Sequence, residues 1–145
     1  MDIKKKTYVC AFVFLAVIAL AVKAGAPVSV RVGGSSLRAN GQVAQGFRYI
    51  GPCPVDLKFG WGLIATGPTT VTYSFVRSDG GHTVNSSTVD IPSANRSIPV
   101  YYDWRLGANN QKFSNFTGWV QLNIESPNQV SQKIPFTLHC GTGVI

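Results

Sequence analysis

Hydrophobic and polar residues alternate along most of the chain, and no segment beyond residue 24 repeats its apolar positions with the period of an α-helix. Alternation with a period of two predicts half-buried β-strands, and clusters of Gly, Pro, Asn, Asp and Ser mark the turns between them. Strands are predicted at Val28–Val32, Gly46–Ile50, Val55–Ala65, Thr70–Ser78, Thr83–Ile91, Ser97–Leu106, Thr117–Ser126 and Gln132–Cys140. The chain is therefore predicted to be all-β, a two-sheet antiparallel sandwich of about seven to eight strands.

In each long predicted strand, one alternate set of residues is apolar and is expected to form the core between the sheets. These inward positions are Val55, Leu57, Phe59, Trp61, Leu63, Val71, Tyr73, Phe75, Ile98, Val100, Tyr102, Trp104, Leu106, Val120, Leu122, Ile124, Ile134, Phe136 and Leu138. Cys53 continues the inward phase of the strand that follows it, and Cys140 continues that of the last strand. Both sulfur atoms are therefore expected to point into the sandwich, with the bridge at one of its ends.

The N-terminal segment has the pattern of an export signal. Lys4–Lys6 precede an apolar run over Val9–Val22, which is short for a membrane span and suits the core of a signal peptide. We expect cleavage after Ala24, so that residues 1–24 are a cleavable signal peptide and residues 25–145 form a single secreted or periplasmic domain with no integral membrane span after processing. The alternative is an uncleaved anchor, which is disfavoured because the apolar run ends in a lysine.

Removal of the signal removes Cys10 and leaves two cysteines, Cys53 and Cys140. In an oxidising compartment two cysteines pair by default, so one disulfide between them is predicted. Their shared inward phase supports the pairing independently of the count. The alternative is a pair of free, buried thiols.

The charge balance of residues 25–145 is basic, with nine Lys and Arg residues against five Asp and Glu residues. The basic residues are spread along the chain, so no stripe of the kind that binds nucleic acid is predicted. The excess of about four positive charges either keeps the domain soluble or draws it to anionic envelope polymers and phospholipid head groups, an attraction that salt weakens.

Side chains of the kinds that usually act in catalysis or bind metal ions are scarce. His82 and His139 are the only histidines, and no third imidazole or nearby carboxylate completes a metal set of the usual spacing. No serine lies in a strained nucleophile turn, and both remaining cysteines are predicted to be disulfide-bonded. Asp103 and Glu125 take outward phases, which is typical of solvated charge rather than of a catalytic pair. We therefore expect no enzyme, no catalytic residues, no metal and no cofactor.

Several segments resemble the immunoglobulin-like, single-disulfide β-sandwich domains of bacterial secreted proteins. The resemblance is carried by Tyr49–Pro54, Gly67–Gly80, Trp104–Gly107, Gly118–Leu122 and Cys140, which together span most of the domain. It implies an immunoglobulin-like fold but little about function, because such sandwiches act as adhesin segments, spacers, binding modules and inhibitors. The two cysteines lie further apart than in immunoglobulin domains proper, so antibody-like pairing is not implied.

A few aromatic and polar residues take outward phases and are the candidate binding residues. Trp119 alternates with core residues and faces away from them, and Tyr101 shares an outward face with Asp103 and Arg105. Trp119 and Tyr101 are expected to form one platform, because an outward Trp near Tyr, Asp and Arg offers a flat aromatic surface with polar neighbours that suits sugar stacking or protein contact. The alternative is that Trp119 packs beneath the loop Gly107–Asn115. That loop is longer than a hairpin needs, and its candidate binding residues are Asn109 and Asn110.

Two function classes follow from these features. The first is a non-enzymatic secreted or envelope recognition module that binds a protein or glycan, and not nucleic acid, through loops and an exposed aromatic face. The second is a small secreted inhibitor of a protease or other hydrolase. For this second class, Ala65–Thr70 resembles a loop of chagasin-type cysteine-protease inhibitors, although their other motifs are absent.

Overall fold

A computed structural model of the chain describes residues 25–107 and 114–141. The predicted signal peptide and the candidate residues Asn109 and Asn110 lie outside the described residues. Within them the chain is built from strands and one short 3-10 turn, η1 (Gln45–Phe47). The strands are β1 (Val30–Ala39), β2 (Gln42–Val43), β3 (Arg48–Gly51), β4 (Val55–Ala65), β5 (Thr69–Arg77), β6 (Ser87–Ile91), β7 (Ser97–Leu106), β8 (Asn115–Ser126) and β9 (Val130–Cys140).

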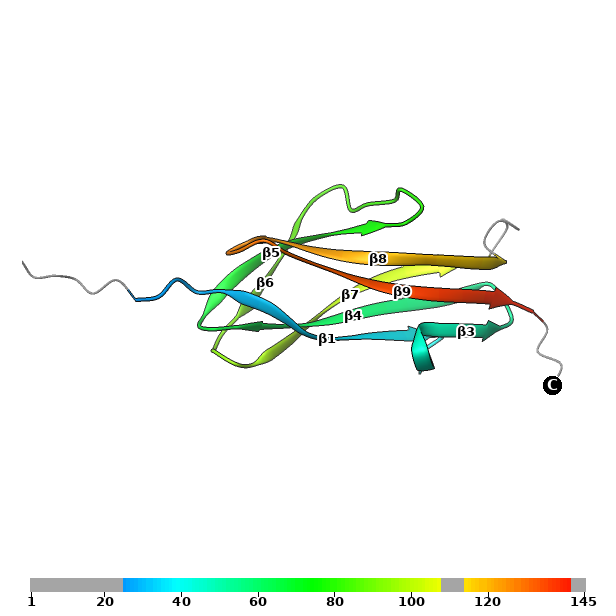
Figure 1. The fold of residues 1–145 in the computed structure, drawn as a ribbon, viewed down its shortest axis with the longest axis horizontal. Helices are drawn as coiled ribbons and strands as arrows, with labels where there is room; N and C mark the ends of the chain where they lie inside the picture. The colour runs from blue at the N-terminus through cyan, green and yellow to red at the C-terminus, as the bar shows by residue number, and fades with distance from the viewer. Residues whose placement is uncertain (1–24, 108–113, 142–145) are drawn as a thin grey trace, which may run out of the picture.

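The strands form two sheets that enclose one core. Sheet A has the order β2-β1-β4-β7, and sheet B has the order β3-β9-β8-β5-β6. Neighbouring strands are antiparallel except for β3, which runs parallel to the end of β9. Figure 1 shows β8 and β9 side by side along the molecule, with β3 beside the C-terminal end of β9. The prediction of an all-β chain with two mostly antiparallel sheets is confirmed.

The core consists mainly of the residues whose phase predicted it. Along β4 and β8 every predicted inward residue is buried, whereas Tyr73, Ile98 and Tyr102 are half-buried at the margin. Aromatic rings join the two sheets, since the Phe59 and Phe136 ring centroids lie 5.1 Å apart in an edge-to-face arrangement. The core also contains residues that were not predicted, namely Val30, Leu37, Ala39, Ala65 and Ile91.

The predicted disulfide is confirmed. Cys53 and Cys140 are bonded, with their Cα atoms 5.4 Å apart and a sequence separation of 87. Cys53 lies where the chain crosses from β3 in sheet B to β4 in sheet A, and Cys140 ends β9. Both cysteines are half-buried against the core. The bridge therefore closes one end of the sandwich.

Two strand boundaries differ from the prediction by four residues or more. The first strand was predicted to end at Val32, but β1 continues through a glycine- and serine-rich segment to Ala39 and pairs with β4 along this length. Small residues carry no hydrophobic alternation, so pattern alone does not detect this part of the strand. The segment predicted from Thr83 becomes regular strand only at Ser87.

Candidate functional site

The predicted binding residues do not form one surface. Tyr101, Asp103 and Arg105 lie on β7 in sheet A, whereas Trp119 lies on β8 in sheet B. All four point away from the core, and the outward faces of two packed sheets point in opposite directions. The expectation of a single platform containing both aromatics is therefore wrong, because β7 and β8 join different sheets.

On sheet A, the candidate residues contact the neighbouring strand. Nη1 of Arg105 lies 2.8 Å from Oδ1 of Asp56 on β4, and Nζ of Lys58 on β4 lies 3.7 Å from Oδ1 of Asp103. Tyr101 lies across from Gly60, close enough that a Cβ at Gly60 would meet the tyrosine ring at 3.0 Å. These contacts hold β7 against β4. Tyr101, Asp103 and Arg105 therefore each have a structural role.

Sheet B presents a different outward surface, which we name the β8–β9 face. Its members are Asn115, Thr117, Trp119, Gln121 and Asn123 of β8 and Ser131, Lys133, Pro135, Thr137 and His139 of β9. Trp119 is half-buried beside Pro135, its partner in the strand pairing. Nζ of Lys133 lies 4.1 Å from the centroid of the Trp119 ring. The face thus has one aromatic residue among mostly polar side chains.

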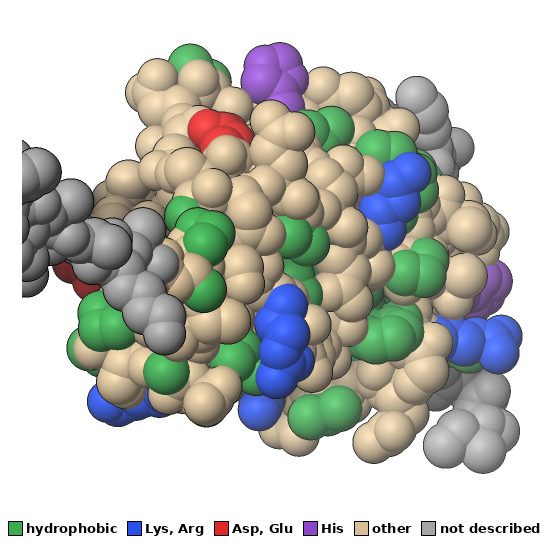
Figure 2. Space-filling view, turned by 60° about the vertical axis from the view of Figure 1, so that its left-hand side comes forward, with side chains coloured by type: hydrophobic (Ala, Val, Ile, Leu, Met, Phe, Trp, Pro, Cys, Tyr) green, Lys and Arg blue, Asp and Glu red, His purple; other side chains and the backbone are tan. Residues whose placement is uncertain are grey.

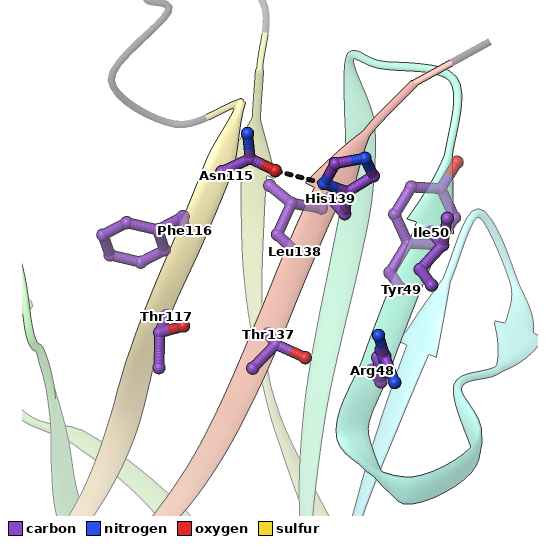
Figure 3. A pocket seen from close by; sticks show the side chains of 9 residues that line it. All are labelled: Arg48, Tyr49, Ile50, Asn115, Phe116, Thr117, Thr137, Leu138 and His139. Atoms are coloured by element: carbon purple, nitrogen blue, oxygen red, sulfur yellow. Dashed lines mark hydrogen bonds between the residues drawn. The ribbon is translucent and has the colours of Figure 1, made fainter. Parts of the chain in front are cut away.

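A groove of about 710 Å³ continues this face towards the edge of sheet B. Figure 3 shows its lining residues on β3, β9 and β8, including Arg48, Thr117 and Thr137. A hydrogen bond joins Nδ1 of His139 on β9 to Oδ1 of Asn115 on β8. The groove therefore offers a guanidinium, hydroxyls and an imidazole within one shallow surface.

Hydrogen bonds also orient the middle of the β8–β9 face. Gln121 Nε2 donates to Asn123 Oδ1 at 2.6 Å, and Ser131 Oγ donates to the same oxygen at 2.8 Å. The Asn123 oxygen is thus occupied from two sides, which holds the amide in one orientation. A polar surface ordered in advance loses less side-chain entropy when it binds a ligand.

Sequence reasoning identified Trp119 but missed the groove residues Arg48, Thr117, Thr137 and His139. Each has an outward phase, which was the available signal. They come together only because β3 pairs in parallel with β9 and β9 pairs with β8, with Arg48 opposite Thr137 and Thr137 opposite Thr117.

The two histidines do not share a site. His82 bridges to Val76 of β5, whereas His139 lies on β9 beside Ile50 and Asn115. Within residues 25–107 and 114–141, no group of three or more His, Cys, Asp or Glu side chains could hold a metal ion. In the same residues, no helix is long and apolar enough to cross a membrane.

The segment compared with inhibitor loops is tied to its surroundings. Thr66 exchanges two hydrogen bonds with Ser29, each of 3.0 Å, one from its backbone amide and one to its side-chain oxygen. Thr70 Oγ1 donates to Asp90 Oδ1 at 2.6 Å. Both ends of Ala65–Thr70 are therefore held by neighbouring strands and the N-terminal segment.

Basic side chains are dispersed on the surface. On the side of the molecule seen in Figure 2, Lys and Arg side chains are scattered among hydrophobic and other groups and form no continuous stripe. Nucleic-acid interfaces usually gather such residues along one face or one helix.

Comparisons with protein-family models, with curated proteins and with solved structures found no match to this chain. Function is therefore inferred from the residues of the surface itself.

Proposed function

We propose that this chain is a non-enzymatic binding module of the cell envelope or extracellular space, built as an immunoglobulin-like sandwich, and that it binds a glycan on the β8–β9 face. The observation that carries the proposal is Trp119, an aromatic side chain that lies outside the core among side chains that are mostly polar. The disulfide supports an oxidising compartment.

The chemistry of the face suits a sugar. A pyranose ring has an apolar face of C–H groups, which stacks on an aromatic ring, and a rim of hydroxyls, which both donate and accept hydrogen bonds. Trp119 supplies the ring, and the rim would find amide and hydroxyl partners in Gln121, Thr117 and Thr137. An extended sheet face also accommodates several sugar units along the strands.

The test compares two aromatic variants on opposite sheets. Trp119→Ala should weaken binding to the glycans that the wild-type protein selects from an immobilised panel by about 30-fold, the loss expected for a hot-spot aromatic. Tyr101→Ala removes an aromatic residue from sheet A and should leave the affinity within about twofold, since it lies on the opposite face. Biolayer interferometry measures both affinities.

Two results would contradict the proposal. One is a wild-type protein that retains no glycan of the panel; the other is an equal loss of affinity in both variants. A panel of cysteine and serine proteases serves as a parallel assay, because potent inhibition there with no glycan binding would favour the inhibitor class instead.

A further inference from the structure

The two outer sheet faces differ in how their charges are paired. On sheet A, Arg105 is paired with Asp56 and Lys58 with Asp103. Acidic side chains thus offset Lys58 and Arg105 across β4 and β7. Arg31 and Arg38 of β1 lie on the same sheet and have no carboxylate within salt-bridge distance among the described residues.

On sheet B the basic residues of β3 and β9 lack such partners. Arg48 of β3 and Lys133 of β9 are exposed, and neither has a carboxylate within salt-bridge distance among the described residues. Strands β3, β5 and β9 contain no Asp or Glu, and β8 contains only Glu125. Glu125 lies four residues along β8 from Gln121, the residue opposite Lys133, and Asp90 lies on β6 at the far edge of sheet B. Within the part of the chain that the structure describes, no carboxylate therefore lies next to Arg48 or Lys133 on this face.

Arg48 and Lys133 lie at opposite ends of one stretch of the outer face of sheet B. Arg48 lies opposite Thr137 in the parallel pairing, and Lys133 precedes Thr137 by four residues on β9. Four residues of extended strand span about 13 Å. Pro135 and Trp119, which pair with each other, lie between the two charges along the strands on the same face. An oligosaccharide spans such a distance, and a monosaccharide does not.

The ammonium group of Lys133 also covers the Trp119 ring on which a sugar would stack. It lies 4.1 Å from the Trp119 ring centroid, a cation–π contact at a solvent-exposed position. Such contacts are worth only about 0.5 to 1 kcal/mol at exposed sites, so a ligand can displace the lysine. A ligand that carries an anionic group compensates the loss, because the displaced ammonium then pairs with that group. A neutral sugar offers no such compensation.

We propose that the ligand of the β8–β9 face is an anionic polysaccharide, with its acidic groups bound by Lys133 and Arg48 and a sugar ring stacked on Trp119. This inference rests on the proposed function and adds the charge of the ligand to it. The carboxylates of uronic acids and sulfate esters both supply anionic oxygens that Lys133 and Arg48 can bind. The experiment below distinguishes between these two anionic groups.

The experiment measures the affinity of the purified protein for polygalacturonate, its fully methyl-esterified neutral form, dextran sulfate, dextran and a single-stranded oligonucleotide. Wild-type protein should bind polygalacturonate or dextran sulfate at least about tenfold more tightly than the matching neutral polymer. Preference between the two anionic polymers identifies carboxylate or sulfate as the recognised group. Binding should weaken as salt is raised.

Charge-matched variants separate this site from the net charge of the molecule. Lys133→Gln and Arg48→Gln should each weaken binding to the anionic polymer about five- to tenfold. Lys58→Gln removes the same charge from sheet A and should change the affinity less than about twofold, because Lys58 faces away and is already paired with Asp103. Near-ultraviolet circular dichroism checks that each variant is folded.

Four outcomes overturn the inference. Equal binding of charged and neutral polymers would refute the anionic ligand but leave a glycan-binding module. An effect of Lys58→Gln as large as that of Arg48→Gln would show attraction by net charge alone. Equal or tighter binding of the oligonucleotide would point to a phosphate-rich partner. Binding of no polymer at all would refute the proposed function together with the inference.

Discussion

At the scale of single residues, Gly107 shows how backbone conformation and packing can require the same amino acid. Its φ is +78°, a region that L-residues with a side chain enter only at a cost. A Cβ there would lie 2.7 Å from Cys53 Cβ and 2.9 Å from Cys140 Sγ. Gly107 follows β7 and lies directly against the disulfide. Close approach of the chain to the bridge therefore depends on this glycine.

Gly107→Ala should lower the free energy of unfolding by about 2 to 4 kcal/mol, combining the cost of positive φ with that of overpacking. Gly41→Ala is the control, because Gly41 also has positive φ, +82°, but has nothing within 4 Å of the added Cβ. It should cost only about 1 kcal/mol. Urea titrations of both variants give the values, and equal losses would mean that contact with the disulfide contributes nothing.

At the scale of elements, β4 is the strand on which the core depends most. It lies between β1 and β7 in sheet A and pairs with both along most of its length. Val55, Leu57, Phe59, Trp61 and Leu63 alternate along it and are all buried. On its other side Gly60 and Gly62 face outward, where a Cβ would meet Ser36, Tyr101 and Ser97. The strand is thus packed on both faces, by large side chains inside and by its neighbours outside.

Phe59→Ala should cost about 3 to 5 kcal/mol, because a fully buried ring that contacts Phe136 of the opposite sheet leaves a cavity when it is removed. Thr72→Ala, on the outward phase of β5, should cost well under about 1 kcal/mol. Equilibrium denaturation monitored by tryptophan fluorescence measures both changes. Comparable losses at the two positions would contradict the assignment of faces.

At the scale of the whole molecule, the disulfide joins the crossing between the sheets to the end of the last strand. It encloses β4 to β9, which is most of the folded chain. Closing a loop of this length removes many conformations from the unfolded chain, an effect of about 4 to 5 kcal/mol in the chain-entropy model before native strain is subtracted.

The free energy of unfolding of the double variant Cys53→Ser/Cys140→Ser should be about 2 to 5 kcal/mol lower than that of the oxidised protein. Thermal and urea melts give the difference, and mass spectrometry of the unreduced protein counts its thiols. Two free thiols in the native protein, or an unchanged midpoint in the variant, would contradict a stabilising bridge. The β8–β9 face lies on strands that pair by backbone hydrogen bonds, so the variant should retain glycan binding while folded.

The candidate site could be predicted only in part. The outward position of Trp119 follows from its phase along one strand, which is local information. The groove residues Arg48 and Thr137 lie far apart in the chain and meet through the parallel pairing of β3 with β9. No local pattern encodes which strands pair, so their proximity could not be obtained from alternation.

By itself, the sequence determined which residues of β4, β5, β7, β8 and β9 face the core and which cysteines pair. Side chains alternate strictly across a strand, and only Cys53 and Cys140 remained to pair once Cys10 was assigned to the signal. Only the tertiary structure decided that Tyr101 and Trp119 lie on opposite faces and that Lys133 covers Trp119. The physical reason is that sheet membership arises from hydrogen bonding between distant strands, whereas phase arises within each strand.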